Sequence, residues 1–142
     1  MKNFFTLPLA VLLSTFVTNV MASDLPRTDS VVGAKAYIVS PSHGAVVDST
    51  FTVVFGLSGM GVAPAGIDKA KTGHHHLLVN NDMLPPDNIP MGTQVTHFGG
   101  GQTETTVTLE PGEHTLQIIL GDKFHVQHNP PIVSQQITVT VK

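Results

Sequence analysis

Three consecutive histidines, His74, His75 and His76, stand in the stretch GHHHLLVN, where they lead into apolar residues typical of a short strand. Side chains alternate between the two faces of a strand, so His74 and His76 share one face, about 7 Å apart, while His75 lies on the other. Two imidazoles on one face can approach a single ion, and zinc and copper favour imidazole ligands. Because such an ion needs three or four ligands, the spacing predicts part of a metal site.

The remaining ligands have to come from other segments, and the chain is rich in histidine, with 8 among 142 residues. His97 lies in the stretch THFGGG, and two more histidines lie in FHVQH. The predicted ligands are His74, His76, His97, His125 and His128. The chain has no cysteine, which excludes a thiolate site, and its carboxylates are too scattered for calcium. We therefore predict that the protein binds a divalent metal ion, Zn²⁺ or Cu²⁺, as its cofactor, and that this ion is its binding partner.

Four further side chains are predicted to support the ligands or to form a polar network: His75, Gln102, Glu104 and Asp122. Carboxylate and carbonyl oxygens commonly orient the second ring nitrogen of a ligating histidine. The same residues also allow a second interpretation, in which the histidines form a buried hydrogen-bond network that specifies the packing without any ion. Residue types and spacing leave both interpretations open.

The other histidines and the methionines have simpler expected roles. His114 begins an apolar strand and is expected to be buried, with its ring satisfied by a backbone group. His43 lies in a turn and is expected to be exposed. Met60, Met83 and Met91 offer thioethers, which suit Cu(I), but singly placed methionines are more often fillers of the core.

The elements that position these residues are predicted to be short strands. Runs of β-branched and apolar residues are separated by Gly, Pro, Asn and Asp, and no amphipathic helix is evident after residue 22. The expected strands are 35–39, 51–57, 74–79, 95–98, 104–109, 114–120 and 135–141. About seven strands predict an all-β fold, an immunoglobulin-like antiparallel sandwich. Three long connections, 59–73, 80–93 and 122–133, are the segments in which function is expected.

The N-terminal segment has the pattern of a secretory signal peptide, with Lys2 before an apolar run and cleavage expected after Ala22. Residues 23–34 are predicted to be a flexible segment and residues 35–142 a single domain. We expect a periplasmic or secreted protein with no membrane span after cleavage, since the apolar run is shorter than about 20 residues. The formal net charge is −3, and the scattered basic residues predict no binding to nucleic acid.

Several blocks of the sequence resemble a family of short exported bacterial proteins that is classed as a domain of unknown function. The blocks are GHHHLL at 73–78, HFGGGQTE at 97–104 and PGEHTLQ at 111–117, with a histidine-containing stretch after Gly121 and Asp122. The likeness extends over nearly the whole chain after the signal peptide. It implies a periplasmic immunoglobulin-like module, and it does not imply a metal, which is inferred only from the residues.

Three functions are therefore considered. The first is a histidine-rich metal-binding module for storage, delivery or sensing of Zn or Cu. The second is a non-catalytic module that binds an envelope partner or another periplasmic protein, with its histidines in a polar network. The third is a metal-dependent hydrolase with Glu104 as base. The chain contains no Gly-x-Ser-x-Gly nucleophile elbow, so a non-catalytic role is favoured over an enzyme.

Overall fold

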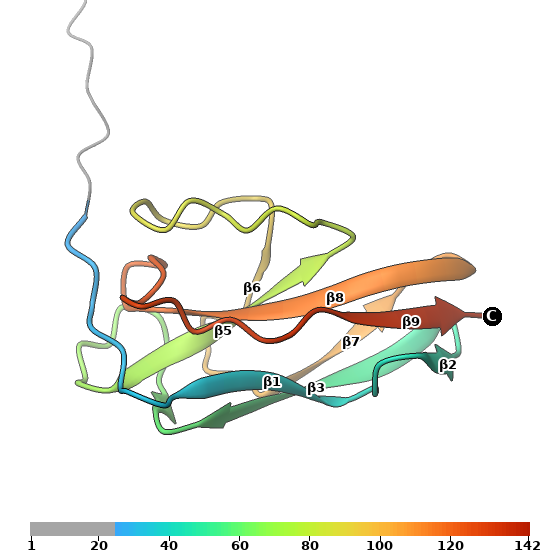
Figure 1. Cartoon of the computed structure of the whole chain (residues 1–142), viewed down its shortest axis with the longest axis horizontal. Coiled ribbons are helices and arrows are strands. Elements are labelled where there is room, and N and C mark those ends of the chain that lie inside the picture. The colour runs from blue at the N-terminus through green and yellow to red at the C-terminus, as the bar shows by residue number, and fades with distance from the viewer. Residues whose placement is uncertain (1–24) are drawn as a thin grey trace, which may run out of the picture.

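A computed structural model describes residues 25–142 as two β-sheets that pack face to face (Figure 1). The smaller sheet has the order β1-β3-β7, with β1 at Lys35–Ser40, β3 at Thr50–Ser58 and β7 at Glu104–Thr108. The larger sheet has the order β2-β9-β8-β5-β4, and β6 also pairs with β5. Its strands are β2 (Ala45–Val47), β9 (Ile137–Val141), β8 (Gly112–Gly121), β5 (Thr72–Val79), β4 (Gly61–Val62) and β6 (Thr96–His97). The predicted all-β sandwich is confirmed.

The hydrophobic core lies between the two sheets and follows from the alternation along their strands. Val53 and Phe55 of β3 face inward from the smaller sheet, and Leu116, Ile118 and Leu120 of β8 face them from the larger one. Intervening residues point away from this core, as the period of two requires. His74 and His76, the first two candidate metal ligands, are not among the residues of this core.

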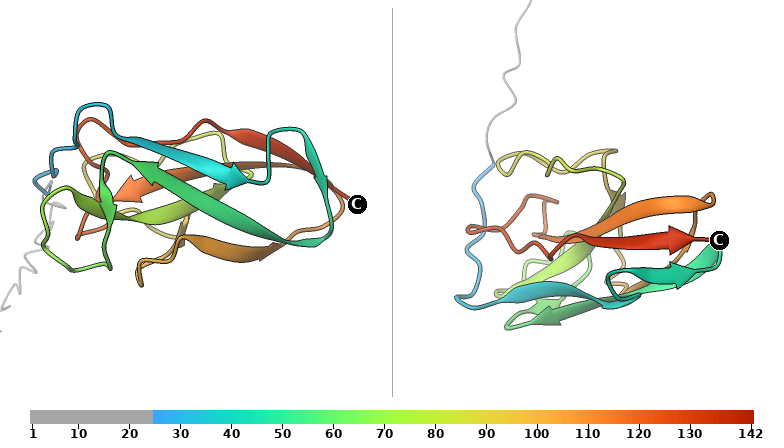
Figure 2. Two further views of the ribbon diagram at one scale, coloured as in Figure 1. Left: turned by 90° about the horizontal axis from the view of Figure 1, so that it is seen from below. Right: turned by 45° about the vertical axis from the view of Figure 1, so that its right-hand side comes forward.

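Strand β5 is buried on both faces because a long connection covers its outer side. His75 and Leu77 face the core, where the ring of His75 lies 5.1 Å from that of Phe55, centroid to centroid. His74 and His76 point to the opposite face. In Figure 1 and in the right panel of Figure 2, the connection formed by residues 80–95 lies over that face as a third layer. The segment is attached there by Gln127, whose amide donates a hydrogen bond to the Pro85 carbonyl at 2.7 Å.

All seven predicted strands are present, with ends that shift by up to two residues, and two short strands are additional. Strand β2 pairs with β9, and β4 pairs with the start of β5. Strand β4 therefore lies within 59–73, which we expected to be a connection without strands. No helix within residues 25–142 is long and apolar enough to cross a membrane.

The predicted signal peptide, residues 1–22, lies outside the described residues. The stretch predicted to be a flexible lead-in, 23–34, is described from residue 25, where it lies against the domain. Asp29 forms a β-bridge with Asn129. Arg27 donates to the carbonyls of Gln127 and His128 and forms an ion pair with Asp87 at 2.6 Å.

Candidate metal centre

The two alternate histidines of β5 lie together on the outer face of the larger sheet. The rings of His74 and His76 are 4.7 Å apart, centroid to centroid, and both side chains are fully buried. Gly121 of β8 is the register partner of His74. A Cβ at position 121 would lie only 2.5 Å from Cε1 of His76, so glycine leaves the space that this ring occupies.

Strand β6 brings His97 to the same face, because His97 is the register partner of His76 in the antiparallel pair. The rings of His97 and His76 are 5.2 Å apart, and those of His97 and His74 are 5.0 Å apart. In contrast to the two β5 histidines, His97 is exposed. Its ring lies against Gly99, where a Cβ would come within 2.3 Å of His97 Cε1.

A tight turn after β8 supplies the fourth histidine. The backbone N–H of His125 donates to the carbonyl of Asp122 at 3.0 Å, and Oδ1 of Asp122 accepts from the N–H groups of Phe124 at 2.9 Å and Val126 at 3.1 Å. His125 has a φ of 64°, which is uncommon for a residue with a side chain and often marks a functional position. Asp122 thus fixes the turn that directs His125 toward the β5 histidines.

Together the four imidazoles of His74, His76, His97 and His125 form one group, in which one ring nitrogen of each lies within 4.8 Å of the others. A tetrahedral ion with metal–nitrogen bonds of about 2.0–2.1 Å needs nitrogens about 3.3 Å apart. Nε2 of His74 and Nδ1 of His125 are already 3.1 Å apart. Small rotations of the other two rings would therefore bring all four nitrogens to coordinating distance. We call this group the imidazole cluster.

The buried half of the imidazole cluster has ring nitrogens without hydrogen bonds. Five buried side-chain nitrogen or oxygen atoms of the described residues lack a partner of normal geometry, and three of them are Nδ1 of His74 and both ring nitrogens of His76. Buried polar groups are nearly always satisfied, and an unsatisfied one commonly marks an ion or water site. A fully buried imidazole without a hydrogen-bond partner of normal geometry fits a metal ligand, which would bind the ion through one of its two ring nitrogens.

The electrostatics of the imidazole cluster favour neutral, ligating rings. Burial, followed by the nearby rings of His125 and His97, lowers the pKa of His74 from 6.5 to about 4, against an opposing effect of Asp122. Burial, followed by the neighbouring histidines, lowers the pKa of His76 to about 3. A metal ion competes with protons for imidazole nitrogens, so rings with a low pKa are available as ligands at neutral pH.

Other predicted site residues lie elsewhere. His128, predicted as a ligand, is fully buried outside the imidazole cluster, and its ring nitrogens lie 3.4 Å and 3.3 Å from the carbonyl oxygens of Leu120 and Thr72. The structure thus places the His128 ring against backbone carbonyls and apart from the other four predicted ligands. His125 lies in the turn after β8, whereas His128 follows Gln127, which forms a β-bridge with Gly121, and the two rings lie in different parts of the domain.

The predicted supporting residues are also divided. Asp122 positions His125, as described above. His75 faces the core, where its Nδ1 lies 3.3 Å from the backbone oxygen of Gln102. The Gln102 side chain accepts a hydrogen bond from the N–H of Gly100 at 2.9 Å, and Glu104 is exposed at the start of β7 in the smaller sheet.

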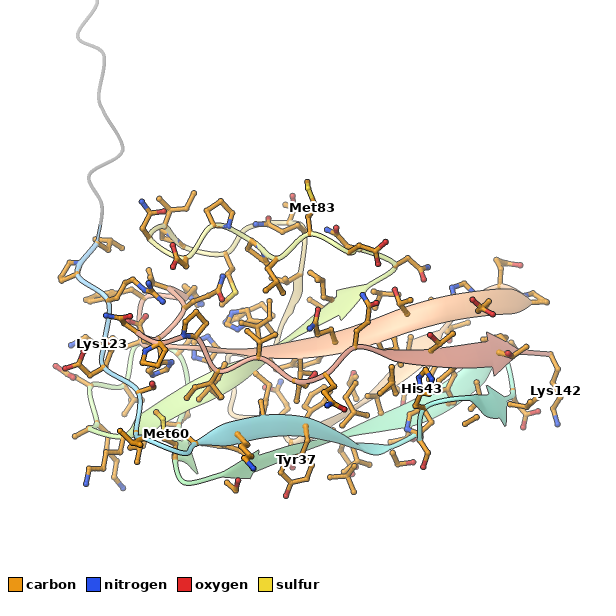
Figure 3. The ribbon with its side chains drawn as sticks, in the orientation of Figure 1. Tyr37, His43, Met60, Met83, Lys123 and Lys142 are labelled. Atoms are coloured by element: carbon orange, nitrogen blue, oxygen red, sulfur yellow. The ribbon has the colours of Figure 1, made fainter. Side chains whose placement is uncertain are left out.

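Two histidines that were expected to be structural bond to the backbone. His114 is half-buried, and its Nε2 lies 2.7 Å from the carbonyl oxygen of Glu110. His43 is exposed, and its Nδ1 accepts a hydrogen bond from the N–H of Thr138 at 3.1 Å. Figure 3 shows His43 toward the end of the domain where the chain terminates at Lys142, with Lys123 near the opposite end.

The glycines beside the imidazole cluster were not identified from the sequence as site residues, although their missing side chains shape it. We expect Gly121→Ala to lower metal affinity by about tenfold or more, the range seen when groups that orient ligands are changed, since the new Cβ displaces the His76 ring. Gly92→Ala is the matched control, because its Cβ would contact only the side chain of Gln94. Calorimetric titration of both variants checks this prediction, which equal affinities would contradict.

The fold and the imidazole cluster together define a two-sheet β-domain with a carboxylate-free histidine site on the outer face of one sheet. The chain belongs to the family described as a domain of unknown function, DUF4399, which it matches over residues 53–142. That match includes all four histidines of the cluster. Comparisons with curated proteins and with solved structures gave no match. The family confirms the resemblance noted in the sequence and leaves the function to be inferred from the site.

Proposed function

We propose that this protein is a metal-binding module that holds one zinc or copper ion in the imidazole cluster. The observation that carries the proposal is the convergence of four imidazoles from three separate segments within 4.8 Å, with both ring nitrogens of buried His76 unpartnered. Four histidine nitrogens form a donor set that suits zinc and copper. The N-terminal pattern of the sequence supports action in the periplasm after export.

The accessibility of the ligands favours storage, delivery or sensing over a purely structural ion. His74 and His76 are fully buried, whereas His125 is half-buried and His97 is exposed. An incoming ligand can therefore reach the ion from the side of His97, while the β5 pair keeps its position on a rigid strand. Such an arrangement allows exchange without unfolding.

The competing interpretation, a polar network without an ion, applies to some of the histidines. His75, His114 and His128 have backbone partners, as a network requires. A polar network does not account for His76, whose ring nitrogens have no hydrogen-bond partner of normal geometry. A metal-dependent hydrolase with Glu104 as base is not supported, because Glu104 lies in the smaller sheet and the imidazole cluster lies on the larger one.

Isothermal titration of the purified protein with Zn²⁺ and Cu²⁺ at about pH 7.5, where imidazole is neutral, tests the proposal. We expect saturable binding of one ion per chain. Chelation of the bound ion should then lower the melting temperature, because an ion that binds only the folded state stabilises it. Absence of heat with both ions at micromolar protein would refute the binding of a divalent metal.

A further inference from the structure

A buried thioether lies beside the imidazole cluster. Met91, in the connection between β5 and β6, is only 9% exposed. Its backbone N–H donates to the carbonyl of His125 at 2.8 Å, which ties it to the turn of the fourth histidine. A Cβ at Gly121 would lie 2.8 Å from the Met91 methyl carbon and 3.0 Å from Nδ1 of His76. The end of the Met91 side chain and an unpartnered nitrogen of His76 therefore both lie within 3.0 Å of the position that a side chain at Gly121 would occupy.

This methionine differs from the other two methionines of the described domain. Met83 is 78% exposed and points away from the sheets at the top of the covering connection (Figure 3). Met60 is partly buried against the hydrophobic core. Met91 is buried, yet it is not among the residues of that core, since it lies on the histidine face of the larger sheet. Its position is thus explained by the imidazole cluster rather than by the packing of the two sheets.

The charge of the site points to a monovalent ion. Imidazole binds a metal as a neutral ligand, and the carboxylate of Asp122 accepts hydrogen bonds from Thr28 Oγ1 at 2.8 Å and from the N–H groups of Phe124 and Val126. The four ligands therefore carry no charge, and the carboxylate of Asp122 acts on the cluster only from outside the ligand set. The cost of burying an ion rises with the square of its charge, so a divalent ion costs about four times as much as a monovalent one of equal size. Among the metals that favour imidazole, Cu(I) is monovalent and also favours thioethers.

We propose that the imidazole cluster holds copper as Cu(I) and that the thioether sulfur of Met91 is an additional soft ligand, which makes the site selective for copper over zinc. This inference rests on the metal-binding function proposed above and names its ion. The thioether adds a donor that Zn²⁺ does not favour, while the imidazoles serve either metal. Met91 is therefore a determinant of metal selectivity.

The test compares wild type with Met91→Leu, which keeps an apolar side chain of similar volume and removes the sulfur. Cu(I) affinity is measured by competition with a chromophoric Cu(I) chelator, and Zn²⁺ affinity by calorimetry. We expect Met91→Leu to lose about tenfold or more in Cu(I) affinity, the scale of other changes at metal sites, with little change for Zn²⁺. X-ray absorption of the wild-type Cu(I) complex should show a sulfur neighbour. Met83→Leu is the matched control, and we expect no effect on either metal.

The outcomes separate this inference from the function on which it rests. Metal binding with no sulfur neighbour, or with equal losses for Cu(I) and Zn²⁺ in Met91→Leu, would overturn the role of Met91 and leave the metal site in place. Failure of wild type to bind either ion would overturn the metal-binding function itself. If Met91→Leu does not fold, the X-ray absorption spectrum of wild type alone shows whether copper has a sulfur ligand.

Discussion

Simultaneous replacement of His74 and His76 with alanine is expected to abolish metal binding at micromolar protein, a loss of about 100-fold or more in affinity. Removal of a group that merely orients a ligand costs about 10- to 100-fold, and this variant removes two ligands outright. These are the two ligands held rigidly by β5, whereas His97 and His125 lie in β6 and in a turn. The two remaining imidazoles are fewer than the three or four ligands that zinc needs, and Met91 would add only a thioether, which favours Cu(I). Calorimetric titration measures the effect.

His43→Ala is the control for this variant, because His43 is exposed and its ring accepts a bond from Thr138 of β9, outside the imidazole cluster. It should bind metal with the affinity of wild type. Equal affinities for the double variant and wild type would show that the ion binds elsewhere, even if the protein binds one ion per chain.

Acidification from about pH 7.5 to 5 is expected to destabilise the metal-free protein by about 4 kcal/mol. The folded-state pKa values of His74 and His76, about 4 and about 3, lie below their ordinary value of 6.5. The unfolded chain therefore binds more protons, and the stability present above pH 6.5 is lost as the pH falls toward the folded-state values. At pH 5 each histidine accounts for about 2 kcal/mol, a large share of the usual margin of about 5–15 kcal/mol. Chemical denaturation at a series of pH values measures it.

A variant with glutamine at both positions is the control, because glutamine is polar and does not titrate. Its stability should depend less steeply on pH than that of wild type in the same range. His75, whose pKa is also lowered chiefly by burial, remains in both proteins and therefore contributes equally to each. Parallel curves for the two proteins would contradict the assignment of acid sensitivity to the imidazole cluster.

The part of the site that could be predicted from the sequence is the part set by local geometry. A period of two places His74 and His76 on one face of any strand, and the structure confirms this arrangement. The contribution of His97 depends on the register between β5 and β6, which pairs it with His76. No local pattern specifies that register, so the sequence offered His97 only as a candidate.

The roles of His125 and His128 could not be distinguished in advance, since both lie in one connection of irregular backbone. The left-handed conformation of His125 and the bonds to Asp122 decide which ring joins the imidazole cluster. Met91 was noted in the sequence only as one of three single methionines. Its proximity to His76 arises from long-range packing over Gly121, for which spacing gives no signal. The fold was easier to predict, although two- and three-residue strands such as β4 and β2 are too short to show a pattern.

The hydrophobic core and the imidazole cluster occupy opposite faces of β5. The apolar contacts that drive folding are therefore complete before any ion arrives, unlike those of small zinc domains that stay unfolded without metal. We therefore expect the protein to fold first and to bind the metal ion afterwards. One folded molecule could then release its ion and bind another repeatedly without unfolding.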